Sequence, residues 1–159
     1  MLKTFWERRR EDEGFTLIEL MVVVLIIGIL IAIALPTFLG ARTRAQNRAA
    51  QSDLRNTLVS AKTIYTDTSS YAGATTTGLA AIEPNLTFIT GASTTANLSV
   101  SVMNPPTATL WGAARMSASG TCYGLHESST TGTYYITNGP TGCTGDAAGT
   151  DTGTARSWT

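Results

Sequence analysis

Hydrophobic and polar positions divide the chain into three stretches with different patterns. Residues 15–39 are almost wholly apolar, residues 41–67 repeat apolar positions with a helical period, and residues 86–137 hold short segments separated by turn residues. A helical region followed by consecutive short strands is typical of an α+β fold. We expect one long helix from Phe15 to Asp67, packed on a small antiparallel β-sheet.

The apolar run from Phe15 to Leu39 is long enough to cross a membrane as a helix. At about 1.5 Å per residue its 25 residues would reach roughly 37 Å, against a hydrocarbon core of about 30 Å. A cleaved secretory signal peptide is disfavoured, because its apolar region should span about 7–15 residues and precede a small-residue cleavage site. The run ends instead in Pro36-Thr37-Phe38. The pattern predicts a membrane-spanning helix or signal anchor.

The second half of the helix is predicted to be amphipathic. Leu54, Leu58, Ala61 and Tyr65 recur at the 4-3-4 spacing of one helical face. We expect this face to lie against the sheet.

Two residues of the apolar run are poor helix formers. Pro36 removes one backbone donor and should bend or loosen the helix. Gly28 is a second weak point, which costs up to about 1 kcal/mol relative to Ala.

Beyond Gly73 the pattern favours strands. Leu-Ser-Val-Ser-Val at 98–102 alternates with period two, which predicts a half-buried strand. The stretch from Gly145 to Thr159 is too polar to bury much surface and is expected to be a flexible tail. Strands are predicted at residues 86–90, 97–103, 110–116, 122–126 and 133–137.

Composition narrows the function only slightly. The 159 residues suit one domain, and 11 basic against 11 acidic side chains give a formal net charge of zero, without a global signal for nucleic acid. From Ser69 onward the surface is rich in Thr, Ser and Gly rather than charge. The chain has two cysteines, Cys122 and Cys143, and one histidine, His126.

The residues Gly14-Phe15-Thr16-Leu17-Ile18-Glu19, followed by the apolar helix, carry a family resemblance. They resemble the class III prepilin signature of type IV pilins and the related pseudopilins. The Gly, the aromatic residue, the Glu at the fifth mature position and the Pro near mid-helix are all in register. The resemblance covers the chain from about Glu13 to Tyr71, whereas the C-terminal region matches only in outline.

The resemblance implies a pilin fold with four parts. Residues 1–14 would be a leader removed by a prepilin peptidase, which cuts between Gly14 and Phe15 and then N-methylates Phe15. Residues 15–39 would be the transmembrane and filament-core helix, 40–68 its amphipathic half, and 69–159 a globular β-sheet head. The leader departs from the usual basic composition, with four basic and four acidic side chains.

The function implied is that of a structural subunit of a type IV pilus, polymerised through its N-terminal helices and without catalytic chemistry or a cofactor. Its partners would be copies of itself, the prepilin peptidase and methyltransferase, the assembly platform and ATPase machinery, and minor pilins. The subunit would cross the inner membrane once before assembly and lie at the cell surface afterwards. Alternatives are the major pseudopilin of a type II secretion system and a monomeric, membrane-anchored binding module.

Glu19 is the only ionisable residue of the apolar run. For an arbitrary membrane helix, such a carboxylate near one end would simply reach the lipid headgroups. In the family this Glu pairs with the free N-terminal amine of a neighbouring subunit. The resemblance therefore assigns Glu19 to assembly, together with Gly28 and Pro36.

Cys122 and Cys143 allow two interpretations. With one histidine and no Cys-x-x-Cys motif, a metal site is disfavoured. In an exported domain a disulfide is the simpler account. His126 beside Glu127 suggests acid–base chemistry, but no nucleophile accompanies the pair, and a packed or solvated strand histidine is favoured.

Overall fold

The computed structural model describes residues 15–151 and 155–158, so the predicted leader lies outside the described residues. Two compact units divide at Ala41 and Arg42. The elements are α1 (Leu17–Thr68), α2 (Thr76–Ile82), β1 (Phe88–Ile89), β2 (Val100–Val102), β3 (Leu110–Met116), β4 (Cys122–Ser128), β5 (Gly132–Thr137), the 3-10 helix η2 (Thr141–Cys143) and α3 (Gly145–Thr150).

The long helix is confirmed, and α1 begins and ends within two residues of the predicted bounds. It continues through Pro36. Its predicted face is also confirmed: Leu54, Leu58 and Ala61 are buried, and Tyr65 packs against the same core. Apolar spacing alone therefore identified the side of α1 that covers the sheet.

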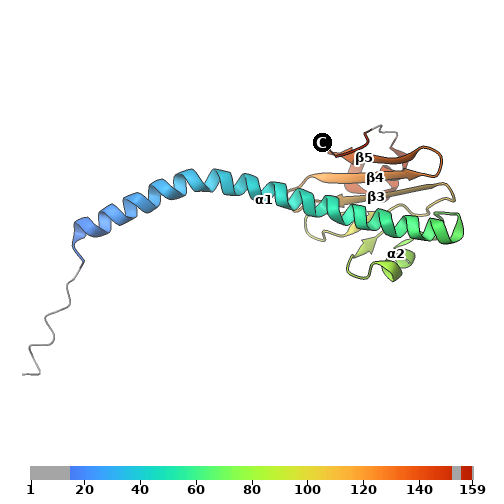
Figure 1. Cartoon of the computed structure of the whole chain (residues 1–159), viewed down its shortest axis with the longest axis horizontal. Helices are drawn as coiled ribbons and strands as arrows, with labels where there is room; N and C mark the ends of the chain where they lie inside the picture. The colour runs from blue at the N-terminus through green and yellow to red at the C-terminus, as the bar shows by residue number, and fades with distance from the viewer. Residues whose placement is uncertain (1–14, 152–154, 159) are drawn as a thin grey trace, which may run out of the picture. The chain divides into compact units, whose positions relative to one another are not determined.

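The sheet has five strands in the order β1-β2-β3-β4-β5. Figure 1 shows the neighbouring strands β3, β4 and β5 beside α1. The predicted antiparallel arrangement holds from β2 to β5. It is wrong for β1, which pairs parallel to β2 with Phe88 opposite Val100. Residues 90–99 form a connection long enough to return the chain in the same direction, which a tight hairpin cannot do.

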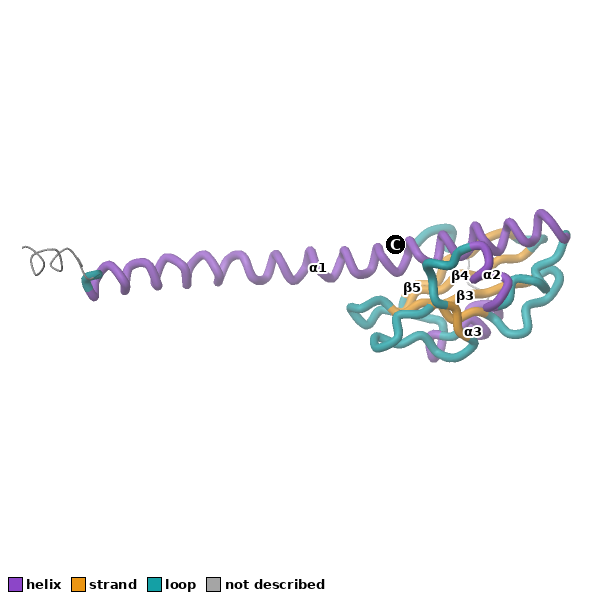
Figure 2. The backbone as a smooth tube through the Cα atoms, turned by 90° about the horizontal axis from the view of Figure 1, so that it is seen from below, coloured by secondary structure: helices purple, strands orange, loops and turns teal. Residues whose placement is uncertain are grey.

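Both faces of the sheet are covered, by α1 on one side and by α3 on the other (Figure 2). Two hydrophobic clusters result. The α1 side is the larger and includes Leu54, Leu79, Val100, Val102, Trp111, Tyr123 and Leu125, whereas the α3 side holds Ala114, Ile136, Cys143 and Ala148.

This second layer corrects two expectations. The stretch from Gly145 is not a tail, because it forms α3 with Ala148 fully buried. The strand around 98–102 is not half-buried either: Ser101 is also inaccessible, and its hydroxyl accepts a hydrogen bond from the Gly145 N–H at 2.8 Å. A polar residue can therefore lie inside because a backbone donor satisfies it.

Residues near the C-terminus also pack against the sheet. The Tyr135 N–H donates to the Ala155 carbonyl at 2.9 Å, and the Trp158 indole N–H donates to the Gly124 carbonyl at 3.2 Å. The Trp158 ring contacts Tyr135 edge-on, with centroids 4.6 Å apart. These contacts also contradict the expected tail.

Glycines allow α3 to approach the sheet closely. A Cβ atom at Gly112 in β3 would lie 2.2 Å from the Gly149 nitrogen, and one at Gly145 would lie 2.2 Å from the Met103 nitrogen. In both cases the obstacle is backbone, which cannot move aside as a flexible side chain can. The sequence G-D-A-A-G-T forms a short helix that packs directly on strand backbone.

Candidate assembly site

The described part of the N-terminal unit is the first portion of α1, and its apolar side chains are exposed. Every residue from Phe15 to Leu39 is exposed. This part of α1 is long and apolar enough to span a membrane by length and composition. Its surface is the candidate site of assembly.

Thr16 and Glu19 close the start of α1 through reciprocal hydrogen bonds. The Thr16 backbone N–H donates to Glu19 Oε2 at 2.8 Å, and the Glu19 N–H donates to Thr16 Oγ1 at 3.3 Å. The Thr16 hydroxyl donates to the same carboxylate at 2.6 Å. This is a capping box, which satisfies backbone donors that a helix start leaves unpaired.

The capping box gives Glu19 a role within its own chain that the sequence interpretation missed. The signal was available, because Ser or Thr followed three residues later by Glu is the pattern of such a cap. The predicted pairing of Glu19 with the Phe15 amine of another subunit requires a second copy and stays a prediction.

Gly28 and Pro36 both lie within the exposed part of α1. Nothing lies within 4 Å of the position that a Gly28 Cβ would take. Just after Pro36, the Thr37 hydroxyl donates to the Ala34 carbonyl at 2.8 Å. Their predicted roles in assembly depend on neighbouring subunits and stay predictions.

The head contains the predicted disulfide, which joins Cys122 at the start of β4 to Cys143 in η2. Cys143 is buried against Ala114, Ile136 and Ala148. The bond therefore ties the segment that leads into α3 to the strand beneath it.

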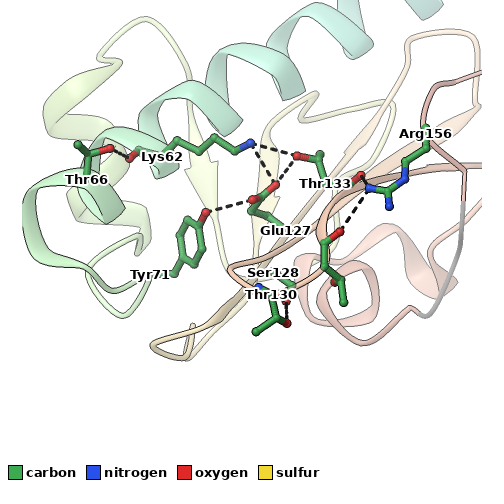
Figure 3. A network of polar contacts seen from close by, with 9 residues as sticks. Lys62, Thr66, Tyr71, Glu127, Ser128, Thr130, Thr133 and Arg156 are labelled. Atoms are coloured by element: carbon green, nitrogen blue, oxygen red, sulfur yellow. Dashed lines mark hydrogen bonds and ion pairs between the residues drawn. The ribbon is translucent and has the colours of Figure 1, made fainter.

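A buried carboxylate connects α1 to the sheet (Figure 3). Glu127 in β4 is 4% exposed and accepts a hydrogen bond from the Tyr71 hydroxyl at 3.1 Å. Its other oxygen accepts from the Thr133 hydroxyl and lies 3.5 Å from Lys62 Nζ. Lys62 also donates to Thr133 Oγ1 at 3.1 Å. A charge buried in this way is tolerated because every oxygen has a partner.

Burial and the contact with Glu127 both affect the pKa of Tyr71. Burial raises the pKa of the Tyr71 hydroxyl well above its ordinary value, and the negative charge of Glu127 and the hydrogen bond to it act in the same direction. Ionised Tyr71 would lie beside a carboxylate in a poorly solvated place.

A second ion pair fixes the other end of this contact. Arg115 in β3 pairs with Asp53 of α1 and donates from Nε to the Leu98 carbonyl at 3.0 Å. Burial lowers the pKa of the Arg115 guanidinium. The two networks hold α1 on the sheet. Their partners are far apart in sequence, so no local sequence pattern predicts these contacts.

His126 is a packed strand histidine, as favoured from the sequence. Its ring lies 5.8 Å from that of Tyr134, and its Nδ1 is buried without a hydrogen-bond partner. Within residues 15–151 and 155–158, no group of three or more His, Cys, Asp or Glu residues is placed to hold a metal ion.

The N-terminal segment also matches a known family. Residues 9–35 match the family described as the prokaryotic N-terminal methylation motif. The match includes Gly14, Phe15 and Glu19.

Curated relatives have names of two kinds. The chain is 41% identical over 61 residues to the type IV major pilin protein PilA of Myxococcus xanthus, covering 38% of this chain and 28% of that protein. It is 36% identical over 83 residues to the type IV wide pilus major component PilA4 of Thermus thermophilus, covering 50% and 63%. It is 40% identical over 47 residues to the type II secretion system core protein G of Aeromonas hydrophila, covering 30% and 33%.

The chain thus spans less than two thirds of the length of each of these relatives. No solved structure matches the chain.

Proposed function

Because the chain belongs to the type IV pilin and pseudopilin superfamily, we propose that it is the structural subunit of a type IV pilus filament. The observation that carries the proposal is the apolar surface of α1, which is exposed throughout residues 15–39 and follows directly on the methylation motif. Lipid would cover this surface before assembly, and the helices of other subunits would cover it afterwards.

We propose that a membrane peptidase removes residues 1–14 by cutting between Gly14 and Phe15. The new amine of Phe15 is then methylated. This leaves a cation at the end of an apolar helix, about 6 Å along the helix axis from Glu19 of the same chain. A neighbour displaced by a comparable step brings its amine to the Glu19 carboxylate, and this pair sets the register between subunits.

Assembly would require the partners that the family resemblance implies. These are an assembly platform with its ATPase, minor pilins and the inner membrane as the place from which subunits are extracted. The subunit would cross that membrane once and reach the cell surface in the filament. Identical subunits joined by contacts between different patches form open helical polymers when the rotation between subunits does not close a ring. The subunit itself performs no catalysis in this proposal.

The second candidate is the major pseudopilin of a type II secretion system, favoured by the likeness to the core protein G of Aeromonas hydrophila. Both candidates share the processing step and the packing of α1. They differ in the product, since a pilus extends beyond the cell and a pseudopilus would remain a short periplasmic filament. Electron microscopy of cells expressing the chain at natural levels separates the two.

Processing provides the direct test against the third alternative, a monomeric membrane-anchored binding module. In Gly14→Val the branched side chain should block the peptidase, so the leader is retained and filaments are lost while membrane insertion continues. The matched control is Gly91→Val in the head, where nothing lies within 4 Å of the added Cβ. Intact-mass measurement of the N-terminus gives the answer. Wild-type chain that keeps residues 1–14 would refute the assignment to a pilus.

A further inference from the structure

Exposed charges of opposite sign lie at the two ends of the head-forming half of α1, residues 42–68, with Asp53, Arg55 and Lys62 between them. Arg42, Arg44 and Arg48, here called the arginine segment, lie in its first two turns and are exposed. Asp67 is exposed in the last turn of the same helix. Opposite charges therefore lie at opposite ends of this half of α1.

No residue that the structure describes forms an ion pair with either group. Among the residues that the structure describes, the ion pairs join Lys62 to Glu127 and Arg115 to Asp53. The arginine segment and Asp67 form none of these pairs.

Each group is also unfavourable for the isolated helix. Arg44 and Arg48 are four residues apart, and like charges at this spacing repel each other. Asp67 lies at the negative end of the helix dipole, where a basic residue would be preferred, and the last turn of α1 contains no basic residue. Local helix stability therefore accounts for neither group, and a partner of opposite charge outside the subunit would offset both costs.

We propose that Asp67 of one subunit pairs with Arg44 and Arg48 of a second copy of this chain in the filament. The inference rests on the proposed function, because it requires subunits with parallel α1 helices. From Arg48 to Asp67 the helix rises about 29 Å, and from Arg44 to Asp67 about 35 Å. A subunit displaced by this distance along the filament axis brings its arginine segment level with Asp67 of its neighbour.

The contact joins different patches and so fits a polymer. At about 100° per residue, Asp67 lies about 100° around the helix from Arg48 and about 140° from Arg44. The two groups therefore occupy different sides of α1, and one subunit can use both at once with two different neighbours. Such a heterologous contact does not close into a dimer.

Charge reversal in the full chain, in cells that assemble the filament, tests the pairing. Arg44→Glu with Arg48→Glu should reduce surface filaments to about one fifth of wild type or less, because a small loss at each exposed contact is repeated at every subunit. Asp67→Arg should do the same. Combining all three changes restores opposite charges and should recover at least about half of the wild-type filaments.

Controls separate assembly from folding and from total charge. Immunoblots should show equal subunit levels in the membrane for all variants. Asp67→Arg should leave the melting temperature of the subunit unchanged or raise it, because a cation suits the end of the helix. Thr109→Glu with Ser129→Glu adds acidic residues to exposed loop positions of the head and should leave filament number unchanged.

Salt offers an independent measurement. At about 1 M salt, charges are screened beyond about 3 Å, so shear should break wild-type filaments more readily than at about 0.15 M. Filaments of the triple variant should show the same dependence.

The outcomes distinguish this inference from the proposed function. Normal filament numbers in the double arginine variant or in Asp67→Arg would overturn this inference and leave the proposed function intact. Failure of the triple variant to recover would also overturn it and would indicate that the arginines face another partner, such as lipid phosphate. Absence of filaments from the processed wild-type chain would overturn both.

Discussion

The two units of the chain differ in whether their large apolar side chains are exposed or buried. Of the 20 large apolar side chains that are exposed among the described residues, 18 lie between Phe15 and Leu39. In the head, by contrast, Leu54, Trp111 and Leu125 are fully buried, and covered sheet faces produce two clusters. Burial of one such side chain is worth about 1.5–3 kcal/mol, so the N-terminal unit leaves tens of kcal/mol to be gained outside the subunit.

This contrast shows where stability and assembly reside. The head obtains its core from its own residues, so its folding depends on contacts within one chain. If the chain assembles as proposed, lipid or other subunits would cover the N-terminal helix, so its burial would depend on the state of assembly. Changes to the apolar surface of the first unit should therefore alter filaments, and changes to the buried core of the second should alter folding.

The largest effect is expected from Glu19→Gln, because it separates the two roles of this residue. Gln can still accept the hydrogen bonds of the capping box, so the start of α1 should be preserved. The negative charge is lost, and the neighbouring amine would be left unpaired in the filament core at a cost of about 3 kcal/mol or more. We expect processing and membrane insertion at normal levels and at least a tenfold loss of surface filaments, at about 1.4 kcal/mol per tenfold.

The matched variant is Thr16→Val, which removes the capping hydroxyl and keeps the carboxylate. It should weaken the helix start by about 1 kcal/mol and reduce filaments much less. Filament counts by electron microscopy, with membrane levels from immunoblots, compare the two. If Glu19→Gln assembles normally and Thr16→Val does not, Glu19 serves as a helix cap and not as a partner for the amine.

The sequence predicted the N-terminal helix better than the head. The methylation motif, the apolar run and the amphipathic face of α1 are local patterns, and the structure confirms the helix and its buried face. β3 was located without error, because Leu110–Met116 is bounded by turn residues. The head otherwise depends on contacts between distant segments.

Two errors in the head, the expected tail and the half-buried strand, have one physical cause: both segments are buried by contact with a segment distant in sequence. α3 is a six-residue helix of small and polar residues, too short to show a helical period, and its burial depends on the close approach of Gly149 to Gly112. Without α3, Ser101 would have looked solvent-facing. The network around Glu127 joins Tyr71, 56 residues away, and likewise has no local signal.

The second prediction tests the self-sufficiency of the head. In Gly112→Ala the new Cβ would lie 2.2 Å from the Gly149 nitrogen and 2.4 Å from its Cα, so α3 must move away from β3. Overpacking against backbone should lower the free energy of unfolding by about 2–3 kcal/mol. Urea unfolding of a fragment beginning at Arg42 measures it.

Gly91→Ala is the control, because nothing lies within 4 Å of its added Cβ. Both variants replace Gly by Ala, so the effect on the unfolded chain is the same. Gly91→Ala should stay within about 1 kcal/mol of wild type or stabilise slightly. Equal unfolding midpoints for the two variants would mean that the close contact between α3 and β3 does not contribute to stability.

The smallest effect concerns the buried network and depends on pH. Tyr71→Phe removes the hydrogen bond to Glu127 and should lower the free energy of unfolding of the same fragment by about 1 kcal/mol at neutral pH. The pKa of Tyr71 is raised in the folded state, so wild type keeps this contribution below the ordinary tyrosine value of about 10 and loses it as the pH rises further. Above about pH 10 the unfolded chain ionises first, and the stability of wild type should fall relative to Tyr71→Phe by up to about 1.4 kcal/mol per pH unit. The difference between the two proteins should thus be constant near neutrality and shrink or reverse in alkali. Urea unfolding followed between pH 7 and 11 measures it, and a difference that stays constant to pH 11 would show that Tyr71 ionises in the folded head as easily as in the unfolded chain.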